Sequence, residues 1–140
     1  RGLTIVGAAA IDLPAIWCNP EQVQRVFANL IGNAIKFATP ASVIRITAAP
    51  CGDSLEFCVI NEGAGIAAAD VVHIFERRWQ VAGHHEGRGL GLSIVDRIVR
   101  EQGGSISARS LGGTTSFCLK LPLLLAPPAP SPMLAELQTA

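Results

Sequence analysis

The chain has 140 residues, of which 49% are hydrophobic and 16% charged, and its 11 basic side chains balance 11 acidic ones. This length suits one domain that buries a core without disulfides or metals, and the low charge content argues against disorder. The zero net charge argues against a protein that bulk electrostatics hold to nucleic acid or an anionic membrane, and no apolar run reaches the ~20 residues of a membrane-spanning helix.

The first forty residues predict two short strands and a long helix. Residues 3–9 and 15–18 are expected to be strands. Asn19 and Pro20 then give a helix start, because a capping side chain is followed by Pro at the first helical position. Apolar residues recur at helical spacing from there to about residue 38, so the helix is expected to cover that stretch.

The rest of the chain alternates between strand and helix patterns. We expect, in order, a hairpin of strands at 43–49 and 55–60, a glycine loop at 61–66, a short helix at 67–75, a mobile polar loop at 79–88, a helix at 90–101 stopped by Gly103 and Gly104, and strands at 105–108 and 116–121. Strands that alternate with three helices predict a sheet that is covered on one face by helices.

The composition changes sharply after Pro122. We therefore expect one domain over residues 1–122 and a Pro/Ala-rich tail or linker over residues 123–140. The chain begins at Arg1, with neither an initiator Met nor a signal-peptide pattern, which favours a piece of a longer protein.

Four cysteines stand at positions 18, 51, 58 and 118, without a Cys-x-x-Cys pair. This spacing makes a zinc site improbable. Cys58 and Cys118 lie in alternating apolar runs, where free Cys often behaves as a small hydrophobic residue. We therefore expect reduced, structural thiols in a cytosolic setting.

The predicted long helix carries polar residues at intervals of three and four, which places them on one face: Gln22, Arg25, Asn29, Asn33 and Lys36. A solvated stripe explains Gln22 and Arg25. It explains the asparagines poorly, because Asn in a helix costs up to ~0.7 kcal/mol relative to Ala. An amide oxygen is a hard, neutral ligand for Mg²⁺ shared with phosphate, and Lys36 could meet the same phosphates.

Two glycine-rich segments add to this pattern. Residues 61–66 (NEGAGI) directly follow a predicted strand, and their glycines permit close backbone approach to a ligand. Residues 87–92 (GRGLGL) run into a predicted helix, whose exposed N–H groups suit an anion such as phosphate. A dinucleotide-binding fold is the rival explanation, but it places such glycines after the first strand. The sequence contains no P-loop.

Together these motifs resemble the boxes of sensor histidine kinases. Residues 29–37 (NLIGNAIKF) look like the N box, 61–66 like the G1 box, 74–80 (IFERRWQ) like the F box, 87–92 like the G2 box, and 114–117 (TTSF) like the final threonine box. The boxes stand in the family's order and cover about residues 12–122. The resemblance implies the Bergerat ATP-binding fold, which is shared with gyrase, heat-shock chaperone and mismatch-repair ATPases. This fold is an α/β two-layer sandwich with a mixed β-sheet and three helices on one face.

The resemblance also implies roles for single residues. Asn33 would bind Mg²⁺, Asn29 would line the phosphate side, Lys36 would contact phosphate, and Phe37 would pack on the adenine. Gly63 and Gly65 would shape the base pocket, Gly87, Gly89 and Gly91 would hold the lid and phosphates, and a threonine, which the register selects as Thr115, would close the adenine side. The implied nucleotide site comprises Asn29, Asn33, Lys36, Phe37, Asn61, Gly63, Gly65, Ile66, Arg77, Gln80, Gly87, Gly89, Leu90, Gly91, Leu92 and Thr115.

The chain departs from the family pattern at two positions that face the ligand. Asn61 replaces the Asp that accepts a hydrogen bond from the adenine amino group, which removes charge assistance. Gln80 stands where Arg is frequent, and Arg77, Arg78 or Arg88 could substitute for it. His84 and His85 are interpreted as ordinary lid residues, since the family's acceptor His lies on a separate helical domain.

The implied function is the ATP-binding catalytic domain of a two-component sensor histidine kinase, with ATP and Mg²⁺ as cofactors. It would pass the γ-phosphoryl group to a His on a dimerisation domain absent from this chain, with a response regulator as the next partner. Asn29 favours a kinase, because the hydrolysing relatives place a general-base Glu there. The alternatives are a degenerate, ATP-weak pseudokinase scaffold and an anti-sigma-type serine kinase. We expect a cytoplasmic domain that contacts neither nucleic acid nor membrane directly.

Overall fold

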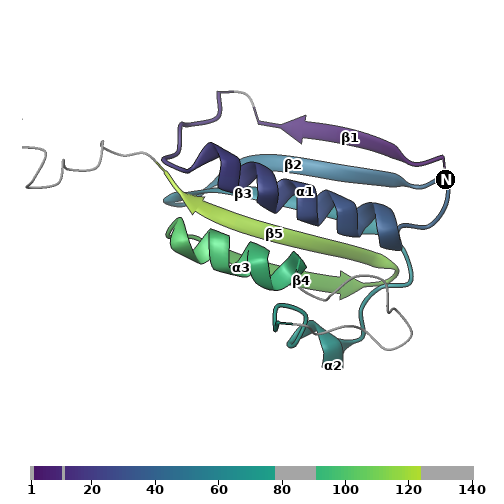
Figure 1. The fold of residues 1–140 in the computed structure, drawn as a ribbon. Coiled ribbons are helices and arrows are strands. Elements are labelled where there is room, and N and C mark those ends of the chain that lie inside the picture. The colour runs from purple at the N-terminus through teal and green to yellow at the C-terminus, as the bar shows by residue number, and fades with distance from the viewer. Residues whose placement is uncertain (1, 11, 78–90, 124–140) are drawn as a thin grey trace, which may run out of the picture.

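The computed structural model describes residues 2–10, 12–77 and 91–123 (Figure 1). Its elements, in chain order, are β1 (Thr4–Ala9), α1 (Pro20–Phe37), β2 (Val43–Cys51), β3 (Ser54–Glu62), α2 (Ala68–Val71), α3 (Gly91–Glu101), β4 (Ser105–Leu111) and β5 (Thr114–Pro122). The strands form one sheet in the order β1-β2-β3-β5-β4, in which β1 runs parallel to β2 and the other neighbours are antiparallel. The predicted two-layer sandwich with a mixed sheet and three helices is therefore confirmed.

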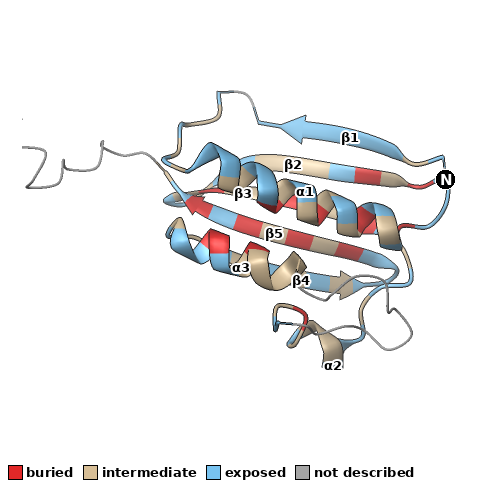
Figure 2. Cartoon of the chain, in the orientation of Figure 1, coloured by how far each residue is buried: buried red, intermediate tan, exposed pale blue. Residues whose placement is uncertain are grey.

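The core lies between the sheet and the two longer helices. Helices α1 and α3 lie on the same face of the sheet and contact one another, while the short α2 contacts β4 (Figure 1). Figure 2 shows buried residues in alternation along β5 and an edge strand, β1, that is exposed throughout. The core side chains come from both layers: Val26, Leu30 and Ala34 of α1, Val95, Ile98 and Val99 of α3, and Ile44, Val59, Phe117, Leu119 and Leu121 of the sheet.

The ends of both long helices follow their sequence signals. The Asn19 side chain accepts a hydrogen bond from the Gln22 N–H at 3.2 Å, and Pro20 is the first helical residue of α1. Helix α3 ends as Gly103 takes a φ of +79°, and the Gly104 N–H then donates to the Val99 carbonyl at 2.9 Å. Glycine adopts this conformation without steric cost, so the predicted stop at this pair is confirmed.

Other predicted elements need correction. Residues 15–18 form no strand, because only Ile16 makes an isolated bridge, with Leu123. The helix predicted over residues 67–75 is only α2, since Ala67 offers no side-chain cap and the chain continues in turns such as the one closed by His73 N–H and Asp70 O at 2.8 Å. The strands β2 to β5 extend beyond their predicted ends, because apolar content marks the middle of a strand better than its ends.

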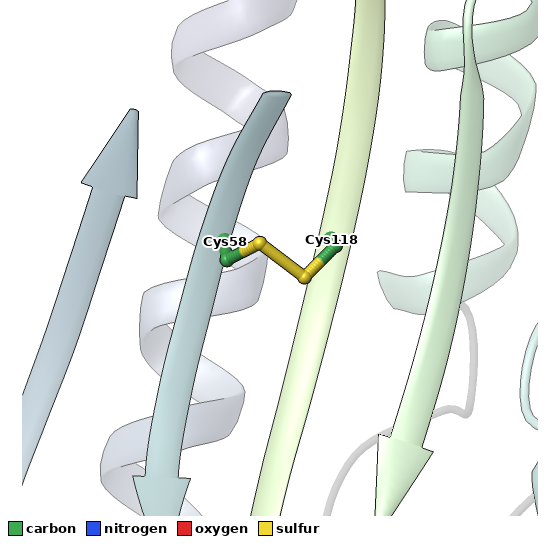
Figure 3. The surroundings of a disulfide bond; sticks show 2 residues. All are labelled: Cys58 and Cys118. Atoms are coloured by element: carbon green, nitrogen blue, oxygen red, sulfur yellow. A yellow bond between two sulfur atoms is a disulfide. The ribbon is translucent and has the colours of Figure 1, made fainter. Parts of the chain in front are cut away.

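The expectation of four reduced thiols is wrong for two of them. Cys58 and Cys118 form a disulfide between β3 and β5, while Cys18 and Cys51 are free (Figure 3). The antiparallel register places the two cysteines directly opposite one another, with 4.1 Å between their Cα atoms. The two cysteines stand 60 residues apart in the sequence, and this spacing alone does not predict that they pair.

None of the helices in the described ranges is both long and apolar enough to cross a membrane. The predicted polar loop at 79–88 and most of the predicted tail lie outside the described residues, so both stay predictions.

Candidate functional site

The polar face of α1 forms one side of the candidate site. Asn29 and Asn33 are half-buried and lie one turn apart, and Lys36 follows near the end of the helix. The Asn29 Nδ2 donates to the Arg25 carbonyl at 3.1 Å. The Lys36 Nζ lies 5.2 Å from the centroid of the Phe37 ring, which is 38% exposed. A half-buried cation and an exposed ring thus lie together at the end of the helix.

The start of α3 meets this face of α1. A Cβ added to Gly91 would lie 3.4 Å from the Asn29 Oδ1, so the first turn of α3 lies directly against Asn29. The next residue, Leu92, is half-buried and packs against the core. The structure thus brings together Asn29 and Gly91, which the sequence predicts on the phosphate side and which stand 62 positions apart (91 − 29).

A buried polar pair lies on β3 and β5. Asn61 and Thr115 are opposite one another in the register and are only 4% and 5% exposed. The Asn61 Nδ2 donates to the Glu62 carbonyl over a long 3.4 Å, and its Oδ1 accepts no hydrogen bond from the residues that the structure describes. A buried acceptor without a partner is costly, so this oxygen fits a site that a ligand donor completes.

Glycines allow the loop after β3 to approach α1 and β4 closely. A Cβ on Gly63 would come within 2.3 Å of the Phe37 carbonyl oxygen, and Gly63 forms a bridge with Ala38. Gly65 has a φ of +80°, and a Cβ there would lie 2.8 Å from the Ser110 Oγ. A larger residue at position 63 would push the loop away from the end of α1, and one at position 65 would push it away from β4, so the two glycines keep this loop close to both elements.

Ser110 joins the loop to the buried pair, and the sequence analysis did not identify it. Its Oγ accepts a hydrogen bond from the Ile66 N–H at 2.8 Å and lies 3.0 Å from the Thr115 Oγ1. Ser110 belongs to β4, which was predicted to end at residue 108. Extending the alternation of β4 by two residues would have placed this hydroxyl on the helix-covered face, opposite Thr115.

The F box is anchored by its apolar residues. Ile74 is 5% exposed, and the Phe75 ring packs edge-to-face on Phe117 with 6.3 Å between centroids. Arg77 is exposed at the end of the described stretch. The remaining predicted site residues lie outside the described ranges, as do the alternative arginines and the two lid histidines: Gln80, Gly87, Gly89, Leu90, Arg78, Arg88, His84 and His85.

The donor set of the site suits a metal that arrives with phosphate. Within residues 2–10, 12–77 and 91–123, no three His, Cys, Asp or Glu side chains gather into a group that could hold a metal ion. The Asn33 amide oxygen is a hard but neutral ligand, and one such ligand cannot hold Mg²⁺ alone. The residues present therefore fit Mg²⁺ only when phosphate oxygens supply further ligands.

Comparisons with known proteins agree with this geometry. Residues 18–125 match the family described as histidine kinase-, DNA gyrase B-, and HSP90-like ATPase. The chain is 36% identical to the sensor protein TorS of Escherichia coli strain K12 over 128 residues, which are 90% of this chain and 14% of TorS. This chain thus spans about a seventh of that curated relative.

Solved structures give the same picture. The full-length ShkA structure in complex with AMPPNP matches with a TM-score of 0.77 and 31% identity, over 87% of this chain and 26% of that one. The nucleotide-free catalytic domain of the histidine kinase ThkA matches with a TM-score of 0.78 and 23% identity, over 87% of this chain and 80% of that one. The second match covers most of a catalytic domain, and at that identity it shows the fold.

Proposed function

Because the chain belongs to the family of histidine kinase-, DNA gyrase B- and HSP90-like ATPases and has the Bergerat fold of histidine kinase catalytic domains, we propose that it binds Mg²⁺–ATP as the catalytic domain of a sensor histidine kinase. It passes the γ-phosphoryl group to a His on a dimerisation domain that this chain does not contain. A response regulator then receives the group. The AMPPNP complex of ShkA supports the choice of nucleotide.

The proposal is carried by one observation: two sets of polar residues meet where Gly63 packs against Phe37. On one side of this contact lies the buried pair of Asn61 and Thr115 on β3 and β5. On the other side lies the α1 face that carries Asn33 and Lys36. A nucleotide has the same two ends, a flat base with hydrogen-bonding edges and a charged phosphate chain.

Each end then has a chemical role. The Asn61 Oδ1, which accepts no hydrogen bond from the described residues, accepts one from the amino group of adenine, and Phe37 packs on the ring. Asn29, Lys36 and the Gly91 end of α3 bind phosphate oxygens, and Asn33 holds Mg²⁺ with them. The metal, when bound, neutralises charge on the phosphate oxygens. Everything else this chain supplies to the reaction is positioning and charge, since the acceptor lies elsewhere.

Asn29 also favours transfer over hydrolysis. Its amide is neutral and its Nδ2 already donates to the Arg25 carbonyl, so it cannot act as a general base towards water. The γ-phosphate therefore waits for an acceptor. A domain that uses ATP in this way works where ATP is held, so we place it in the cytoplasm.

A second candidate function rests on Asn61. The buried amide lacks the charge of the family's Asp, and among the described residues its NH₂ donates only a long hydrogen bond, to the Glu62 carbonyl. A pocket weakened in this way suits an ATP-weak pseudokinase that serves as a scaffold. An anti-sigma-type serine kinase is less well supported, because the F-box residues Ile74 and Phe75 are integrated into the fold.

Calorimetric titration of the 140-residue chain with Mg²⁺–AMPPNP tests the proposal. We expect saturable binding below millimolar concentration, and weaker binding in Asn33→Ala. Gln22→Ala is the matched control, since it changes an amide on the same helix that is interpreted as solvated, and it should bind as the parent chain does. No heat and no thermal shift at millimolar nucleotide would refute a kinase and favour the scaffold. For transfer, radiolabelled γ-phosphate should reach a His in a chain that carries the dimerisation domain.

A further inference from the structure

The Cys58–Cys118 disulfide lies on the face of the sheet that the helices leave open. Along β3 and β5 the neighbouring residues Val59, Phe117 and Leu119 belong to the core under α1 and α3, whereas the two cysteines do not. Because successive side chains of a strand point to opposite faces, the cysteines point away from the helices. Figure 3 shows the disulfide on the side of the strands opposite the helices. Cys58 is 8% exposed and Cys118 is half-buried, so Cys118 is the more exposed of the two residues and the one we expect a small thiol to reach first.

The disulfide joins the same two strands that carry the candidate base pocket. Cys58 pairs with Cys118 in the register, and three positions further along Asn61 pairs with Thr115. At about 3.4 Å per residue, the covalent link lies roughly 10 Å from the buried pair. Thr115 in turn contacts Ser110, which holds the loop at Ile66. Any opening of β3 from β5 at this end therefore disturbs the whole base side of the pocket.

We propose that Cys58 and Cys118 form a reversible redox site that controls nucleotide affinity. The disulfide holds β3 against β5 next to Asn61 and Thr115, and its reduction lets the two strands separate there. The inference rests on the proposed nucleotide function. Its substrates are low-molecular-weight thiols and disulfides, which reach the sheet from the open face. Disulfides are rare in the cytosol and are mostly transient or redox-sensing there, which fits a reversible link better than a structural one.

The chemistry is thiol–disulfide exchange. A thiolate of a dithiol attacks the Cys118 Sγ, the S–S bond breaks, and the Cys58 sulfur leaves as a thiolate that takes up a proton. The second thiol of the reductant then attacks the mixed disulfide, which releases Cys118 as a thiol and the reductant as its own cyclic disulfide. Two electrons pass to the protein. In the reverse direction, one glutathione disulfide and the two protein thiols give the protein disulfide and two glutathione molecules.

The test compares nucleotide binding by the 140-residue chain after glutathione disulfide and after dithiothreitol, with thiols counted by mass spectrometry of alkylated protein. Reduction should add two alkylation sites, raise the Kd for Mg²⁺–AMPPNP by at least about threefold through a smaller binding-competent population, and lower the Tm by about 10 °C. Re-oxidation should restore the Kd. Cys18→Ser/Cys51→Ser is the matched control, because it removes the two free thiols and should respond as the parent does.

Cys58→Ser/Cys118→Ser should bind nucleotide with the Kd of the reduced chain, and the oxidant should not change that Kd. If this variant fails to fold, the comparison of the two redox states of Cys18→Ser/Cys51→Ser is the test. Four alkylated thiols after oxidant, or an equal Kd in both redox states, would overturn the inference. Absence of binding in both states would instead refute the proposed function. In that case, amide hydrogen exchange at Asn61 and Thr115 tests the redox site. Faster exchange after reduction would support it, and unchanged exchange would overturn it.

Discussion

In the proposed nucleotide site, Asn61 is the residue on which we expect the strength of binding to depend most directly. Its Oδ1 is buried and has no donor among the described residues, so it is available to an amino group. Because an amide gives a weaker hydrogen bond than a carboxylate, restoring the acid should strengthen that bond. We expect Asn61→Asp to tighten Mg²⁺–AMPPNP binding by about 1–2 kcal/mol, or roughly ten- to thirtyfold in Kd, as measured by calorimetry.

The same substitution should weaken the ligand-free protein. A carboxylate at a position that is 4% exposed is expensive to bury. The Tm without nucleotide should therefore fall while the affinity rises. Thr115→Val is a useful control, because it removes the neighbouring hydroxyl and should weaken binding in both backgrounds. Unchanged affinity in Asn61→Asp would mean that this side chain does not contact the base.

The sequence predicted the positions of some site residues and not of others. Asn29 and Asn33 stand out because Asn is a poor residue for the middle of a helix, and the structure places both, half-buried, on one face of α1 as expected. Ser110 gave no such signal, since a serine near the end of a strand is common. Its importance comes only from the register, which sets its Oγ 3.0 Å from the Thr115 hydroxyl.

At the scale of elements, the stability of α1 depends on its N-cap residue, Asn19. The Asn19 side chain caps the helix through the Gln22 N–H, and the Asn19 N–H donates to the Gln102 Oε1 at 3.0 Å, which ties the start of α1 to the end of α3. We expect Asn19→Ala to lower the free energy of unfolding by about 1 kcal/mol, as measured by urea denaturation. Asn19→Asp should retain stability, because Asp caps a helix as well as Asn. Equal losses in both variants would show that the cap contributes nothing.

Elements were predictable where local signals were strong. Helix α1 has a cap, a proline and a long apolar period, and its bounds were predicted within one residue. Residues 15–18 have only a short apolar run, and without a neighbouring strand for its hydrogen bonds this run makes one bridge to Leu123. The Cys58–Cys118 link was missed for a related reason: pairing between β3 and β5 is a long-range property, which no local pattern encodes.

At the scale of the whole molecule, net charge is zero although the proposed ligand is an anion. The proposed anion site is therefore local, and glycine backbone, two asparagines and Lys36 would form it rather than a general positive field. The fold could be predicted because the motifs stand in one order along the chain. How close the motifs lie in space could not be predicted from that order, since it depends on how α1 and α3 pack on the same face of the sheet.

Because one core joins both helices to the sheet, we expect nucleotide to stabilise the whole chain in a single unfolding transition. At 100 times its Kd, Mg²⁺–AMPPNP should add about 2.7 kcal/mol of stability, or roughly 8–10 °C in Tm, measured by calorimetry or fluorescence. Replacing Mg²⁺ with EDTA should reduce this shift, because the phosphates and Asn33 then lose the cation that they share. Asn33→Ala in Mg²⁺ should match the parent in EDTA. A shift that EDTA leaves unchanged would contradict the assignment of the metal to Asn33, while the Asn61 pocket could still bind the base.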